Sequence, residues 1–205
     1  MSRQQRRKAV TGLALATVLA MGAATAHAAD ELPALPPELA KLRASLDKYR
    51  DPYVAIRDGY FSTIACIDYP KVSGDSARLP YRTGGMGIHF LNMQFVGPEP
   101  DPEKPPILLY EPDGDRLKLV GVEWFVPLAT GVKQRPAVLG QPFDGPMLGH
   151  EPVMPEGLHH YDLHAWLWKA NPNGLFSGTN PDLKCDGYHY TVTETDAPHL
   201  APTAQ

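Results

Sequence analysis

The sequence predicts an α+β fold in which N-terminal helices pack on a mostly antiparallel, curved sheet stapled by one disulfide. Helical periodicity is confined to the segment before residue 60, and short alternating apolar runs follow it. The 22 prolines and 18 glycines among 205 residues favour short elements with ordered loops and exclude long helical bundles. This length suits one globular domain.

Residues 1–28 are typical of a signal peptide. Four basic residues precede an apolar run, from Ala9 to Ala24, that is too short to span a bilayer comfortably. Ala26 and Ala28 are the small residues that a signal peptidase requires before its cleavage site. We therefore expect a periplasmic or secreted protein with one domain over residues 29–205 and no stable membrane anchor. A buried N-terminal helix is the alternative.

The charge of the mature chain restricts its partners. Removal of residues 1–28 takes away four basic residues and no acidic residue, so the formal net charge falls from −4 to −8. Such a charge opposes binding to nucleic-acid phosphates and to anionic membrane surfaces. We expect no nucleic-acid partner, and a metal ion or a small molecule as the ligand.

The two cysteines, Cys66 and Cys185, predict the disulfide, because a single pair in an oxidising compartment is usually oxidised. Closing this loop of about 120 residues stabilises the fold by ~4–5 kcal/mol through chain entropy. A redox or copper-binding thiolate pair is the alternative, but no CxxC spacing favours it.

Two helices are predicted at the start of the mature domain. The first carries apolar residues three or four positions apart, namely Leu39, Leu42, Leu46 and Tyr49. Asp51 suits an N-cap and Pro52 suits the first helical position, so a second helix is predicted from Pro52 to Asp58 or Tyr60.

A strand is predicted from Met86 to Phe95, and a hairpin is predicted over residues 107–127. The turn formers Pro112-Asp113-Gly114 favour a three-residue hairpin loop. Alternation then places Glu123 on the same face as Ile107, Leu109, Leu117 and Leu119. Because both faces are apolar near the middle, the hairpin belongs to a covered or strongly curved sheet.

Residues 131–157 contain five prolines and no periodicity, which predicts mostly loop. A connection of this length is usually functional or mobile, and a lid is one such role. A further strand is predicted from His160 to Lys169, with His160, Asp162 and His164 on one face.

Histidines and carboxylates on these strands are candidate metal ligands, since imidazole and carboxylate groups suit zinc, copper or iron. Glu123 on an apolar face needs a partner, because an unpaired buried carboxylate costs several kcal/mol. If His89, Glu123 and His164 converge, they form a two-histidine, one-carboxylate site with room for water or substrate. His160 is a further candidate ligand, and copper or zinc is the expected cofactor.

Other interpretations of these residues remain open. The histidines can satisfy one another or face water, and His89 can be a core residue. A metal-free ligand-binding module would use Glu111 or Glu123 as the polar anchor of a pocket lined by three aromatic side chains, Trp124, Trp166 and Trp168. A structural component of the cell envelope with incidental histidines is the third possibility.

Four runs of sequence carry a resemblance to a known group. They are MGIHFLN at 86–92, LLYEP at 108–112, GVEWFVP at 121–127 and LHAWLWKANP at 163–172. Together they resemble a group of uncharacterised exported bacterial proteins, over about half of the chain. The resemblance implies a single exported domain and supplies no catalytic residue.

Overall fold

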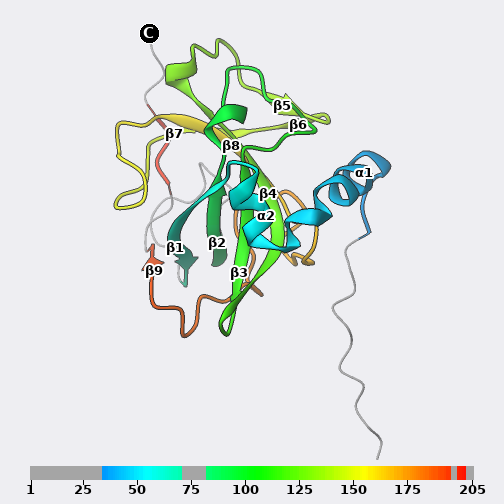
Figure 1. The fold of residues 1–205 in the computed structure, drawn as a ribbon. Helices are drawn as coiled ribbons and strands as arrows, with labels where there is room; N and C mark the ends of the chain where they lie inside the picture. The colour runs from blue at the N-terminus through cyan, green and yellow to red at the C-terminus, as the bar shows by residue number, and fades with distance from the viewer. Residues whose placement is uncertain (1–33, 71–81, 195–197, 202–205) are drawn as a thin grey trace, which may run out of the picture.

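The computed structural model describes residues 34–70, 82–194 and 198–201, and the predicted signal peptide lies outside these ranges. Short N-terminal helices precede a strongly curled, mostly antiparallel sheet of seven strands (Figure 1). The predicted fold class is therefore confirmed. No helix in the described part of the chain is both long enough and apolar enough to cross a membrane.

Helix α1 (Pro37–Leu46) leads through the 3₁₀ turn η1 (Asp47–Arg50) into α2 (Pro52–Arg57). The side chain of Asp51 caps α2 by accepting a hydrogen bond from the Tyr53 amide at 3.0 Å. The periodic leucines of α1 are buried, as their spacing predicted. Both predicted helices are confirmed.

The seven strands of the sheet lie in the order β7-β8-β4-β3-β2-β1-β9. Only β9 runs parallel to its neighbour β1, and every other adjacent pair is antiparallel. The bounds are β1 (Phe61–Tyr69), β2 (Gly84–Leu91), β3 (Ile107–Asp113), β4 (Arg116–Pro127), β7 (Asp144–Met147), β8 (His160–Ala165) and β9 (Thr191–Thr193). Strands β5 (Ala137–Val138) and β6 (Gln141–Pro142) form a separate small hairpin.

The two faces of the sheet are buried in different ways. On the convex face the hydroxyl of Tyr110 donates a hydrogen bond to the Tyr49 carbonyl at 2.6 Å, in the core that the helices share with the strands. The concave face carries a lateral row of paired residues, Leu91, Ile107, Glu123 and His164. The prediction that the hairpin belongs to a covered or strongly curved sheet is confirmed.

The predicted three-residue hairpin loop is wrong. Asp113 pairs with Arg116, so Gly114 and Asp115 form a two-residue turn. Gly114 has a φ of 62°, which suits the first central position of a type II′ turn.

A bulge in β4 also changes the predicted faces. Leu109 pairs with Gly121, but Tyr110 pairs with Leu119, which leaves Val120 as the extra residue. Leu119 therefore shares the face of Tyr110 rather than that of Leu109 as predicted. Glu123 lies beyond the bulge, so it keeps the predicted face, and in the observed register it pairs with Ile107.

Two predicted boundaries also differ from the structure. Strand β2 ends at Leu91 rather than Phe95, because Asn92 caps the 3₁₀ turn η3 (Met93–Phe95) by accepting a hydrogen bond from the Gln94 amide at 3.0 Å. Strand β8 ends at Ala165 rather than Lys169. The segment 131–157, which follows the turn η4 (Leu128–Thr130), is mostly loop as predicted and also contains the short strands β5, β6 and β7.

The predicted disulfide between Cys66 and Cys185 is confirmed. The two Cα atoms lie 5.8 Å apart, and the residues are separated by 119 positions in the chain. The bond joins β1 to the segment that leads into β9, and both residues are buried. It therefore attaches the C-terminal part of the chain to one end of the sheet.

Candidate metal centre

The concave face of the sheet encloses a cavity of about 260 Å³. Strands β1, β2, β3, β4 and β8 contribute to its wall, and the segment 150–158 after β7 completes it. Most of the wall is apolar. The polar groups among its lining residues are Thr63, His89, Glu123, His150, His160, Asp162, His164 and Glu194.

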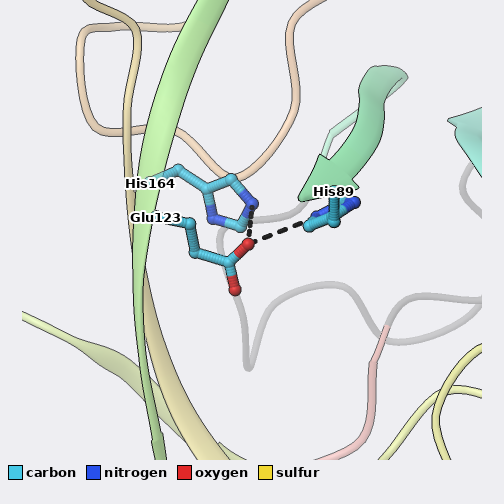
Figure 2. A group of neighbouring side chains, drawn as sticks. All are labelled: His89, Glu123 and His164. Atoms are coloured by element: carbon cyan, nitrogen blue, oxygen red, sulfur yellow. Dashed lines mark ion pairs between the residues drawn. The ribbon is translucent and has the colours of Figure 1, made fainter. Parts of the chain in front are cut away.

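Three of these polar residues converge on one point, as the sequence predicted. His89 of β2, Glu123 of β4 and His164 of β8 each offer one ligand atom, and these atoms all lie within 4.8 Å of one another. Nε2 of His89 is 3.2 Å from Oε2 of Glu123, and Nε2 of His164 is 3.6 Å from the same oxygen. Figure 2 shows both imidazole rings beside this one carboxylate.

The curl of the sheet makes this convergence possible. Glu123 and His164 are directly paired across β4 and β8, whereas β3 separates His89 from Glu123. Strands two positions apart in a flat sheet are roughly 9–10 Å apart. Gly121 permits a close approach of the strands here, because a Cβ at this position would lie 2.8 Å from the Ala165 carbonyl oxygen.

The three side chains are largely withdrawn from solvent. Those of Glu123 and His164 are 5% and 2% exposed, and that of His89 is 14% exposed. Within the described residues, both ring nitrogens of His164 and Nδ1 of His89 are buried without a hydrogen-bond partner. Buried polar atoms in native proteins normally have partners, so these nitrogens point to a ligand.

The ionisation of the cluster suits a metal site. Burial lowers the pKa of His164 to about 4, so this imidazole is neutral at neutral pH. Burial acts to raise the pKa of Glu123, but the neighbouring His164 and His89 outweigh it, and the pKa of this carboxyl is lowered. A neutral imidazole and an ionised carboxylate are the forms that bind a metal ion.

His160, the further predicted ligand, lies in the same cavity but outside this cluster. Its Nδ1 is 3.0 Å from the Leu158 carbonyl oxygen, and its Nε2 is 3.9 Å from Oδ2 of Asp162. His160 cannot join His164 in the cluster, because residues four positions apart on one strand are separated by roughly 13 Å. Burial lowers the pKa of His160 as well.

His150 is a cavity residue that the sequence did not nominate as a ligand. Its Nδ1 is 3.0 Å from the Tyr69 hydroxyl, its ring centroid lies 5.7 Å from that of His160, and burial lowers its pKa to about 4. It belongs to the segment after β7, where no periodicity assigns a face. Its position inside the predicted lid was the only feature of the sequence that could have indicated a place in the cavity.

The predicted aromatic pocket is not assembled. None of the three tryptophans, all of which are described, lines the 260 Å³ cavity. Their indole N–H groups donate hydrogen bonds to other parts of the chain instead. Trp124 donates to the Asp101 carbonyl, Trp166 to the Ser177 carbonyl, and Trp168 to Oδ1 of Asp47. Trp124 follows Glu123 directly in β4, so it faces the opposite side of the sheet.

Glu111, the other predicted anchor, also lies away from this cavity. Its carboxylate is 3.1 Å from Nζ of Lys169 and accepts a hydrogen bond from the Lys184 amide at 3.0 Å. With Trp168 it borders a second hollow of about 280 Å³. Its protein partners give it a structural role in holding the segments around Lys169 and Lys184.

Comparison of the chain with protein-family models, with curated proteins and with solved structures yields no match.

Proposed function

We propose that this protein is an exported metalloprotein that binds one divalent transition-metal ion, zinc or copper, through His89, Glu123 and His164. The observation that carries the proposal is the convergence of three ligand atoms, from three different strands, within 4.8 Å of one another at a buried site. Cross-strand pairing and the curl of the sheet fix the backbones that hold them.

The ligand set favours a reactive centre over a structural one. Structural zinc sites are closed by four protein ligands, whereas catalytic sites use three and leave a position for water or substrate. Three ligands on a cavity wall follow the second arrangement. An ion held there would act as a Lewis acid or lower the pKa of a bound water.

Export is part of the proposal because two features agree with it. Residues 1–28 have the pattern of a signal peptide. The buried disulfide suits a compartment in which thiols are oxidised. N-terminal sequencing of the chain recovered from the periplasm or the medium should begin at Ala29, and a chain that retains residues 1–28 would contradict cleavage.

Elemental analysis tests the metal site directly. Residues 29–205, without a histidine tag, are purified from the periplasm and dialysed against a weak chelator. We expect about one equivalent of zinc or copper, because three ligand atoms hold an ion against weak competition. The His164→Ala variant should lose the metal and retain its near-ultraviolet circular dichroism spectrum.

His159→Ala is the matched control, because His159 is in the same segment but does not line the cavity. It should retain the metal. Absence of bound metal in the wild-type protein, together with no rise in melting temperature on addition of zinc or copper, would overturn the proposal.

A further inference from the structure

We infer that the cavity beside the metal centre binds a small apolar molecule, about the size of one substituted aromatic ring, that coordinates the ion through a single polar head group. This inference rests on the proposed metal function and adds the class of ligand. Its support comes from the wall, the volume and the opening of the cavity.

Apolar side chains surround the three candidate ligands on several sides. Strands β1 to β4 contribute Ile67, Met86, Leu91, Ile107 and Phe125, and the segment after β7 contributes Val153, Met154, Pro155 and Leu158. A highly polar ligand would place its polar groups against these apolar side chains, where they would find no hydrogen-bond partner. The wall therefore favours a ligand whose body is apolar.

The volume limits the size of that body. A cavity of about 150 Å³ admits benzene, and drug-sized ligands occupy roughly 300–1,000 Å³. The cavity here, at about 260 Å³, lies between these values. One substituted ring or a short acyl chain fits, and a larger multi-ring molecule does not.

Two lining residues mark where the cavity opens. Val153, in the segment after β7, is 36% exposed, and Met93, just after β2, is 57% exposed, yet both line the cavity. A residue that both lines a cavity and contacts solvent lies at its mouth. The apolar mouth admits an apolar molecule, with the polar centre deeper in the site.

The charges in the cavity favour direct coordination as the means of holding the head group. A divalent ion bound by one carboxylate and two imidazoles keeps a net positive charge, which favours an oxygen donor such as a phenolate, carboxylate or hydroxamate. With three protein ligands, the ion has an open position at which that oxygen binds.

Two hydroxamates separate the contributions of head and body. Calorimetry on the zinc-loaded protein should show benzohydroxamate binding roughly 10- to 100-fold more tightly than acetohydroxamate, since its ring is buried against the apolar wall. Benzamide, which keeps the ring but lacks the chelating hydroxyl, should bind far more weakly than benzohydroxamate.

A variant at the mouth tests the location. Val153→Trp should weaken binding of benzohydroxamate at least about tenfold, because the indole occupies space at the mouth. Ile56→Trp is the matched control, since Ile56 is exposed on α2 and does not line the cavity. It should leave the affinity unchanged. Zinc content is measured for each variant.

Each outcome separates this inference from the proposed function. One equivalent of zinc with equal affinity for the two hydroxamates overturns the apolar ligand and leaves the metal site intact. A Val153→Trp variant that binds benzohydroxamate as the wild type does overturns the location. If the protein takes up no zinc, the proposed function is overturned. If the zinc-free protein nevertheless binds benzamide, the apolar cavity is supported and coordination of the ion by the head group is overturned.

Discussion

Glu123 links the two imidazoles of the site, because its Oε2 lies within 3.6 Å of Nε2 of both His89 and His164. Alternation placed His89 and Glu123 on apolar faces, and His164 was a candidate because it follows His160 and Asp162 on one face of its strand, so the candidacy of all three followed from the sequence alone. Whether His160 or His164 joins the site did not follow, because it depends on which part of β8 the curled sheet brings towards β2. His150 lies outside any strand and gave no periodic signal.

Replacement of Glu123 tests its part in metal binding. Glu123→Gln keeps the shape of the side chain but removes its charge, so we expect the affinity for zinc to fall by more than about 100-fold. Competition against a chromophoric chelator measures this affinity. Glu111→Gln is the control, because Glu111 is a paired carboxylate outside the cavity, and it should bind zinc as the wild type does. Equal affinities in the two variants would remove Glu123 from the site.

The buried histidines predict how the stability of the metal-free protein depends on pH. Burial lowers the pKa of His150 and His164 from 6.5 to about 4, so the unfolded chain binds more protons than the folded chain between these values. The free energy of unfolding should therefore fall as pH decreases through this window, by up to about 3 kcal/mol for each histidine.

Urea unfolding at about pH 7.5 and about pH 4.5 measures this loss of stability. The same comparison for His150→Gln, which does not alter the proposed ligands, isolates the histidine contribution from that of the carboxylates. We expect the variant to lose less stability than the wild type over this interval. An identical loss in both proteins would show that His150 is not held in its neutral form.

At the scale of elements, the segment 148–158 closes the cavity because it folds back on itself. The Gly149 amide donates to the Glu156 carbonyl at 3.0 Å, and the Met154 amide donates to the His150 carbonyl at 2.7 Å. A Cβ on Gly149 would collide with the Pro155 carbonyl oxygen. The sequence predicted a lid here from length and proline content, but not these contacts, because they depend on the closed loop.

Gly149→Ala should disturb this closure. The added methyl group collides with backbone atoms of Pro155, which cannot move aside as the end of a flexible side chain could. We expect faster limited proteolysis within 148–158 and a lower affinity for ligands of the cavity. Gly157→Ala lies in the same segment, where nothing is within 4 Å of an added Cβ, and should behave as the wild type. Equal proteolysis rates for the two variants would contradict close packing of Gly149 against the Pro155 carbonyl.

The elements that the sequence predicted well are those whose signals are local. The leucine spacing of α1 and the Asp51 cap of α2 depend only on neighbouring residues. The hairpin turn and the bulge at Val120 were missed, because they depend on how β3 and β4 register against each other and on the strands beside them. A bulge shifts alternation by one position without leaving a mark in composition.

At the scale of the whole molecule, the strand order is the property that the sequence could not give. Strand β4 lies between β3 and β8, and the last strand, β9, returns to pair with β1 in parallel. Nothing in the sequence of β9 predicts that it pairs with β1. The disulfide is the long-range contact that the sequence predicted outright, because only two cysteines were present to pair.

Removal of the disulfide should destabilise the whole domain. In the Cys66→Ser, Cys185→Ser double variant, we expect the free energy of unfolding to fall by ~4–5 kcal/mol through the larger entropy of the unfolded chain. Urea unfolding of the metal-free variant and wild type measures the difference. Neither cysteine lines the cavity, so the folded variant should still bind one equivalent of zinc. A loss of metal without a loss of stability would contradict this separation.

The three proposed ligands are far apart in the sequence, at positions 89, 123 and 164, and only the assembled sheet brings them together. A newly made chain has no such site until β8 has paired with β4. A metal ion bound by these residues would therefore be acquired late, after the strands have found their order. Metal uptake would then report the completion of folding, and the compartment in which the chain folds would decide which ion it receives.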